Sequence, residues 1–215
     1  MFEIRIHGRG GQGVVTAAEL LSVAAFREGK YAQAFPSFGS ERTGAPVAAF
    51  CRIADEPIRL REPIAEPNAV IVQDPTLLHS FDLFSGLAVD GYVLVNSTKD
   101  TGLLGLEHLA ASRPGHLIII PATDIARTHI GRPIPNIALL GAFAAMTGMI
   151  TLDVLSHAIE EKFSRAIADK NIAAAKVSYE MVMEMGRRVP VGSQVPGTAP
   201  ATRSQGLNNL VLEKC

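Results

Sequence analysis

A short alternating strand, a turn with four glycines and an apolar helix follow one another at the start of the sequence. Residues 2–7 alternate apolar and polar side chains, residues 8–13 read Gly-Arg-Gly-Gly-Gln-Gly, and residues 12–27 predict a helix that is apolar on nearly every side. Such a turn lets backbone N–H groups and a helix N-terminus approach a phosphate. The same spacing also suits a tight turn that needs small residues only for packing. The motif therefore predicts the first βα unit of a Rossmann-like domain and leaves the ligand open.

A dinucleotide site requires, in addition, an acidic residue about 20 positions after the turn, at the tip of the second strand. The count reaches Glu28, which stands beside Gly29 at the predicted end of the helix. The next predicted strand, residues 31–35, is followed by Pro36 and Ser37, with no carboxylate in place to hold a ribose. The sequence therefore disfavours NAD or FAD and retains a phosphate or pyrophosphate as the ligand.

Composition limits the class of protein. The 215 residues suffice for one α/β domain with an appendage, and a net charge of −1 predicts neither nucleic acid nor membrane as a partner. No apolar run reaches the ~20 residues that span a bilayer. The hydrophobic share of 47% predicts a large buried sheet together with a subunit interface. With two cysteines and no secretory signal before the first strand, we expect a cytoplasmic protein.

Strand-like and helix-like segments alternate along most of the chain. Strands are predicted at residues 4–7, 31–35, 46–53, 58–61, 69–72, 92–95 and 117–120, and helices at 12–27, 75–84, 103–111 and 123–129. Helices alone follow, at residues 136–149, 152–163 and onward to about 185.

This order predicts a three-layer α/β/α domain, residues 1–186, with C-terminal helices. Its sheet is expected to be mostly parallel but mixed, because the turn residues 54–57 join the strands at 46–53 and 58–61 into a hairpin. Residues 187–215, rich in proline, glycine and serine, are expected to form an extended or disordered tail.

A second loop, residues 36–45, gathers hydroxyl groups, an arginine and two glycines between two predicted strands. Loops at the carboxyl ends of parallel strands converge on one crevice, so this loop is expected to face the glycine turn. Arg42 has a planar guanidinium that can bind a phosphate with two hydrogen bonds. A surface ion pair between Glu41 and Arg42 is the alternative. The histidines have no metal-site spacing, and no nucleophile motif is present.

Three segments together identify a family. The glycine turn, residues 28–46 and the stretch from Asn136 to Gly141 resemble gamma subunits of 2-oxoacid:ferredoxin oxidoreductases, pyruvate synthases in particular, over residues 2–185. The resemblance implies an α/β module that assembles with alpha, beta and delta subunits and serves ferredoxin as electron acceptor. The implied reaction converts a 2-oxoacid and coenzyme A into acyl-CoA, carbon dioxide and reduced ferredoxin.

Thiamine diphosphate and iron–sulfur clusters supply the chemistry in this family. Cys51 and Cys215 cannot hold a [4Fe-4S] cluster, which takes four thiolates. Residues 89–91, Val-Asp-Gly, are not followed by the Asn-Asn element of a thiamine diphosphate site. Both cofactors are therefore expected on partner subunits, and no catalytic or metal-binding residue is assigned to this chain.

Coenzyme A remains as the ligand that carries phosphates. Residues 10–13 are expected to supply backbone donors, Ser40 and Arg42 to contact phosphate, and Asn136 to line the crevice. The predicted cofactor-binding residues are Gly8, Gly10, Gly11, Gln12, Gly13, Ser40, Arg42, Thr43 and Asn136.

Other interpretations remain open. One is a purely structural subunit, and another, weakened by the missing acidic residue, is a free-standing nucleotide-dependent oxidoreductase. Pyruvate is the expected substrate, with 2-oxoisovalerate, indolepyruvate and 2-oxoglutarate as alternatives.

Overall fold

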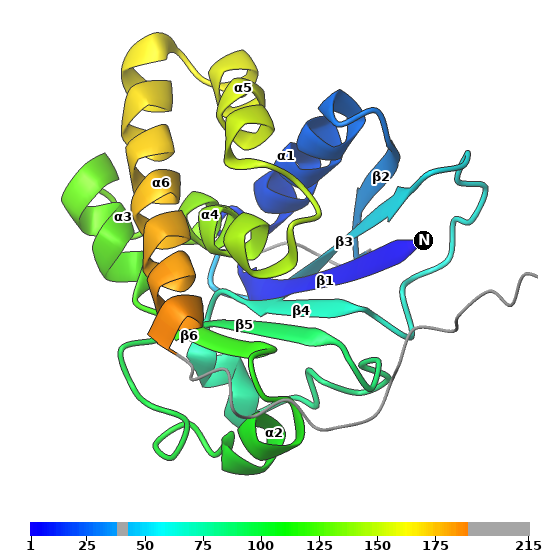
Figure 1. The fold of residues 1–215 in the computed structure, drawn as a ribbon, viewed down its shortest axis with the longest axis vertical. Coiled ribbons are helices and arrows are strands. Elements are labelled where there is room, and N and C mark those ends of the chain that lie inside the picture. The colour runs from blue at the N-terminus through cyan, green and yellow to red at the C-terminus, as the bar shows by residue number, and fades with distance from the viewer. Residues whose placement is uncertain (38–42, 189–215) are drawn as a thin grey trace, which may run out of the picture.

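A six-stranded sheet forms the centre of the computed structural model, which describes residues 1–37 and 43–188 (Figure 1). The strand order is β2-β3-β1-β4-β5-β6. Strands β1, β4, β5 and β6 are parallel, and β3 runs antiparallel to β1 and β2 on either side of it. The strands are β1 Phe2–Arg9, β2 Tyr31–Pro36, β3 Pro46–Ala54, β4 Ala69–Val72, β5 Tyr92–Asn96 and β6 Leu117–Ile120.

The two faces of the sheet are covered unequally (Figure 1). The thicker layer contains α1 Val14–Arg27, α3 Ala122–Ile130, α4 Asn136–Thr147, α5 Leu152–Lys162 and α6 Arg165–Arg188. Within residues 1–37 and 43–188, the only helical elements on the opposite face are the 3-10 turn η1 Pro75–His79 and the short helix α2 Glu107–Ser112. The predicted α/β architecture with a mixed sheet is confirmed.

Strand β4 shows why the central strands are apolar throughout. All four of its residues are at most 1% exposed. Ile71 joins the large cluster under the helical layer, whereas Val70 and Val72 join the smaller cluster under η1 and α2. A strand covered on both faces has no position that favours a polar side chain.

The helical layer closes tightly because small residues line one helix crossing. A Cβ atom built on Gly141 of α4 would lie 2.0 Å from the carbonyl oxygen of Ala175 in α6. Glycine is therefore required where the two helix backbones meet.

The predicted hairpin between residues 46–53 and 58–61 is wrong. Strand β3 lies between β1 and β2, so Ile53 stands opposite both Phe2 and Ala32. Residues 58–61 form no strand. Their sequence, Ile-Arg-Leu-Arg, is mostly exposed, whereas β3 gains burial on both faces by lying inside the sheet. The mixed sheet was predicted correctly and the partner of β3 was not.

Two predicted helices are also shorter than expected. Residues 75–84 contain only η1, because Asp82 accepts a hydrogen bond from the Phe84 N–H in a local turn. The region before α2 is held in turns by Asp100, which accepts from the Leu103 N–H, and by Gly105 with φ of 69°. The predicted tail begins at residue 187, after a helix expected to end near residue 185, but α6 continues through Gly186 to Arg188. The rest of the predicted tail, residues 189–215, lies outside the described residues.

Candidate functional site

The glycine turn lies at the switch point of the sheet. Strand β1 leads through α1 to β2 on one side, whereas β4 lies on the other side of β1. The carboxyl ends of β1 and β4 therefore flank the position where ligands bind in open α/β sheets. Glu28 stands at the end of α1, where its Oε1 accepts a hydrogen bond from the Thr151 N–H, so the prediction that it holds no ribose on β2 is supported by its position.

Three glycines of the turn are required for different physical reasons. A Cβ on Gly8 would lie 2.7 Å from Val14 Cγ2, because strand and helix nearly touch there. Gly13 has φ of 73°, and its Cβ would lie 2.3 Å from Asn136 Nδ2. Gly11 has φ of 95° and open space around its Cβ position. Gly8 and Gly13 thus serve packing, and Gly11 leaves the turn open to approach.

The backbone donors of the turn divide into two groups. The Gly10 N–H donates to Ala45 O at 2.9 Å, and the Gln12 N–H donates to Arg9 O at 3.0 Å. These two of the four predicted phosphate donors are therefore already paired within the protein. Among the described residues, the N–H groups without a hydrogen-bond partner here are those of Gly11, Gly13, Val14, Val15 and Thr16. They form the N-terminus of α1, where the helix dipole also favours an anion.

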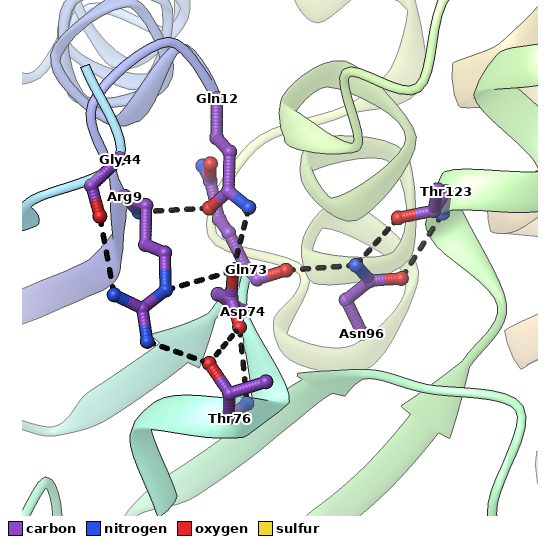
Figure 2. Close-up of polar contacts among 8 residues, drawn as sticks. All are labelled: Arg9, Gln12, Gly44, Gln73, Asp74, Thr76, Asn96 and Thr123. Atoms are coloured by element: carbon purple, nitrogen blue, oxygen red, sulfur yellow. Dashed lines mark hydrogen bonds and ion pairs between the residues drawn. The ribbon is translucent and has the colours of Figure 1, made fainter. Parts of the chain in front are cut away.

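Side chains from the segment that follows β4 brace the turn (Figure 2). Gln12 accepts from the Arg9 N–H at 2.8 Å through Oε1 and donates from Nε2 to Asp74 Oδ2 at 2.9 Å. The Arg9 guanidinium forms an ion pair with the same carboxylate at 3.3 Å and donates to Thr76 Oγ1 at 2.8 Å. Gln12 therefore fixes the shape of the turn, and its side chain is not free to bind a ligand.

The carboxylate of Asp74 is held ionised by this network. Partial burial raises its pKa, but hydrogen bonds from Thr76 and Gln12 and the charge of Arg9 outweigh burial and leave the pKa below its usual value. Asp74 also caps η1 by accepting from the Thr76 N–H at 3.0 Å. The charge of Arg9 is thereby largely neutralised by a neighbour.

The loop after β2 meets the glycine turn, as the sequence predicted. Thr43 and Gly10 form an isolated β-bridge, and the Gly44 N–H donates to Gly10 O at 3.0 Å. Arg9 reaches the same segment and donates from Nη1 to Gly44 O at 3.1 Å. Ser40 and Arg42 lie outside the described residues, so their predicted contacts with phosphate remain predictions.

Asn136 lies against the turn from the opposite side. Its Nδ2 donates to Gly13 O at 3.2 Å, and its Oδ1 accepts from the Ile137 N–H at 2.8 Å. The residue is only 5% exposed, yet it lines a cavity of about 500 Å³ together with Gly11 and Gly13. The structure therefore brings Asn136 to the crevice mainly as a support of the turn.

A row of polar groups continues along the carboxyl edge of the sheet (Figure 2). Asn96, at the end of β5, donates to Gln73 O at 2.7 Å and to Thr123 Oγ1 at 2.8 Å, and its Oδ1 accepts from the Thr123 N–H. The Gln73 side chain is 1% exposed and lacks a hydrogen-bond partner among the described residues. The sequence analysis did not single out Arg9, Gln73 or Asn96. Each is a polar residue at the end of a strand or directly after it, and that position is the signal that could have found them.

The other polar and thiol candidates have structural explanations. His7 lies in β1, and burial together with the nearby Arg5 charge lowers its pKa to about 4, so it is neutral at pH 7. Cys51 is buried in β3, and burial raises its pKa to about 12, which makes it inert. The described ranges contain no cluster of His, Cys, Asp or Glu fit to hold a metal ion. They also include no helix long and apolar enough to cross a membrane.

The fold and this edge define an α/β protein whose glycine turn, at the sheet's switch point, is braced by the segment before β3 and the segment after β4. Residues 3–181 match the family model described as pyruvate ferredoxin/flavodoxin oxidoreductase, and the chain belongs to this family of oxidoreductase subunits. The resemblance to gamma subunits of 2-oxoacid:ferredoxin oxidoreductases is thereby confirmed.

Individual relatives agree with this assignment. The chain is 51% identical over 179 residues to the pyruvate/ketoisovalerate oxidoreductases common subunit gamma of Thermococcus kodakarensis, covering 83% of this chain and 96% of that one. It is 50% identical over 186 residues to the pyruvate synthase subunit PorC of Methanothermobacter marburgensis, covering 86% and 100%. The crystal structure of the pyruvate oxidoreductase subunit PORC from Thermotoga maritima is 40% identical, with a TM-score of 0.71 and coverage of 83% and 95%.

Proposed function

We propose that this chain is the gamma subunit of a pyruvate:ferredoxin oxidoreductase and that its glycine turn binds the phosphates of coenzyme A. The complex would convert pyruvate, coenzyme A and oxidised ferredoxin into acetyl-CoA, carbon dioxide and reduced ferredoxin. The names of the relatives, which specify pyruvate, support the choice of substrate.

The observation that carries the proposal is the set of unpaired N–H groups at the start of α1. Gly11, Gly13 and the first residues of the helix offer five backbone donors with no acceptor in the described chain. Two cavities border these donors: one of about 300 Å³, lined by Arg9 and Val47 among others, and the 500 Å³ cavity lined by Asn136. A pyrophosphate is an acceptor-rich anion that satisfies such donors and suits the positive end of a helix.

Coenzyme A fits the turn better than a nicotinamide or flavin dinucleotide. The turn is followed by no carboxylate on β2, so the usual hydrogen bond to a ribose hydroxyl is missing. We also assign Ser40, Arg42 and Thr43 to the phosphate site, because Thr43 is joined to Gly10. The bracing by Gln12 and Asp74 prepares the turn before the ligand arrives, which reduces the entropy lost on binding.

The remaining cofactors belong to partner subunits in this proposal. Only Cys51 and Cys215 are present, so the four thiolates of a [4Fe-4S] cluster are not available in this chain. We expect alpha, beta and delta subunits to hold the clusters and thiamine diphosphate and to deliver electrons to ferredoxin, in the cytoplasm. The part played by this chain is then to bind and orient one substrate.

A structural role without ligand contact is the second candidate. Exposed apolar side chains favour it: Phe26 is 73% exposed, Val89 90% and Leu103 69%, which is typical of surfaces that other subunits cover. The relative from Thermococcus kodakarensis is named as common to pyruvate and ketoisovalerate enzymes. By analogy, such a gamma chain would leave the choice of 2-oxoacid, 2-oxoisovalerate included, to its partners.

Titration of the assembled complex with coenzyme A separates the two roles. Gly11→Ala places a methyl group at the open side of the turn and strains the backbone, so coenzyme A affinity is expected to fall about tenfold or more. The matched control is Gly29→Ala, which has φ of 78° and equally open surroundings but lies at the far end of α1. Equal affinities for both variants and the wild type would refute ligand binding at the turn.

The Arg42→Ala variant tests the loop assignment in the same titration. A charged hydrogen bond to phosphate contributes about 1.5–3 kcal/mol, so the dissociation constant is expected to rise at least tenfold. Unchanged affinity would remove Arg42 from the site while leaving the role of the turn in place.

A further inference from the structure

Strand β6 forms one outer edge of the sheet in the part of the chain that the structure describes (Figure 1). Its sequence, Leu-Ile-Ile-Ile, contains neither a charge nor a proline, its register with β5 is continuous, and its first three residues are only partly buried. Native sheets protect their edges with charged side chains, proline, bulges or a covering segment, because an open apolar edge pairs with other chains. Strand β6 has none of the first three protections, so we expect a segment to cover it.

The register identifies the backbone groups that this edge leaves open. The carbonyl groups of His116 and Ile120 each accept a hydrogen bond from the β5 side of the sheet. In a parallel pair of strands, alternate residues bond to the same neighbour, so Ile118 also faces β5. The N–H and C=O groups of Leu117 and Ile119 are therefore directed away from β5. Among the described residues, no turn or loop group forms a backbone hydrogen bond with either of them.

The open edge of β6 is apolar on both faces of the sheet. The Ile118 side chain packs against the large cluster under the helical layer, whereas Leu117 and Ile119 pack against the smaller cluster under η1 and α2. A strand placed beside β6 would extend both clusters. Such a strand needs apolar side chains on both of its faces, since alternating polar residues would meet one of the clusters.

Residues 207–212 of this chain, which lie outside the described residues, have the required composition. They read Leu-Asn-Asn-Leu-Val-Leu, and the segment that precedes them is rich in proline, glycine and serine. In an extended conformation, the side chains of Leu210 and Leu212 would point to one face and that of Val211 to the other. The family model ends at residue 181, so these residues lie outside the part of the chain that it matches.

The connection from α6 to β6 is long enough for this segment to reach the edge. Helix α6 ends at Arg188 and packs on α3, which begins at Ala122, directly after Pro121 and the end of β6. Residues 189–206 would span at most about 60 Å when fully extended. A domain of this size measures about 40 Å across, so the length of the connection places no limit on the pairing.

We infer that residues 210–212 pair with β6 of the same chain as an antiparallel seventh strand and close this edge of the sheet. Leu210 would lie opposite Ile119 and Leu212 opposite Leu117, which gives all four open backbone groups a partner. The two leucine side chains would extend the smaller cluster, and Val211 would extend the large one. A parallel strand of three residues would satisfy only half of these groups. The pairing does not involve the glycine turn, so it is independent of the proposed function.

Hydrogen exchange of single backbone amides in the ¹⁵N-labelled full chain tests this pairing. In the Leu210→Asp/Leu212→Asp variant, the double leucine variant, burial of the segment would place two carboxylates in an apolar cluster. The Leu117 and Ile119 N–H groups are therefore expected to exchange about tenfold or more faster in this variant than in the wild type. The neighbouring N–H groups that face β5 should keep their protection in both proteins. Neither substitution alters a residue of the described domain, so its fold is expected to persist.

The control is Ser204→Asp/Gln205→Asp, which adds the same two charges to the C-terminal segment outside residues 210–212. The Leu117 and Ile119 N–H groups should exchange at the wild-type rate in this control. Equal exchange rates in the wild type and the double leucine variant would overturn the inference. Protection in the wild type that disappears on about tenfold dilution would also overturn it, because a second copy of the chain would then cover the edge.

Discussion

The contact between Gly13 and Asn136 gives the sharpest prediction for the architecture of the site. In Gly13→Ala the new Cβ would lie 2.3 Å from Asn136 Nδ2, at a backbone φ of 73°. The left-handed conformation costs a residue with a side chain about 1 kcal/mol. Displacing Asn136 breaks its hydrogen bonds to Gly13 O and the Ile137 N–H, at about 1 kcal/mol each. The free energy of unfolding should therefore fall by about 3 kcal/mol.

Urea unfolding of the full chain, followed by circular dichroism, measures this loss. Gly29→Ala provides the matched control, since its φ is 78° and no atom lies within 4 Å of its Cβ position. That variant should lose only the backbone cost of about 1 kcal/mol. In an Asn136→Ala background, Gly13→Ala should likewise cost only about 1 kcal/mol, because the clash is gone. If Gly13→Ala proves no more destabilising than Gly29→Ala, the close packing of the turn on α4 is refuted.

Two further predictions concern stability. Gly141→Ala places a Cβ 2.0 Å from Ala175 O and should lower the free energy of unfolding in urea by about 3 kcal/mol. The control Gly186→Ala, which has open space around its Cβ position on α6, should not lower it. Equal effects of the two variants would contradict the close helix crossing. His7 has its pKa lowered from 6.5 to about 4, so the unfolded chain binds more protons between these pH values. The free energy of unfolding should fall by about 3 kcal/mol as the pH drops through this window. In His7→Gln this pH-dependent loss should be absent. An identical pH profile for the variant and the wild type would refute the burial of a neutral His7.

Patterns that depend on neighbouring residues were readable from the sequence. The apolar runs at 69–72 and 92–95 are central strands because both their faces are covered. Glu28 was correctly placed at the end of the helix because glycine follows it. Both observations use positions next to each other in the chain, where propensity and periodicity act directly.

Features that depend on the order of the strands in the sheet could not be predicted from the sequence. Strand β3 takes its place between β1 and β2 because burial on both faces outweighs a local turn at 54–57, and no short pattern encodes that competition. The contacts within the candidate site also depend on the order of the strands and were not readable from the sequence. The turn itself was predicted, but the pairing of Gln12 and Arg9 with Asp74 joins residues more than 60 positions apart. The pairing of the Gly10 N–H, one of the four predicted backbone donors, with Ala45 O likewise joins segments that are far apart in the chain.

The most direct measurement of the central claim is the response of individual backbone amides to coenzyme A. In the ¹⁵N-labelled full chain, addition of coenzyme A should shift the N–H resonances of Gly11, Gly13 and residues 14–16 strongly downfield, because these donors gain an acceptor. The N–H resonances of Gly10 and Gln12, which already donate to Ala45 O and Arg9 O, should move much less. Unchanged resonances at Gly11 and Gly13 under saturating coenzyme A would contradict the account.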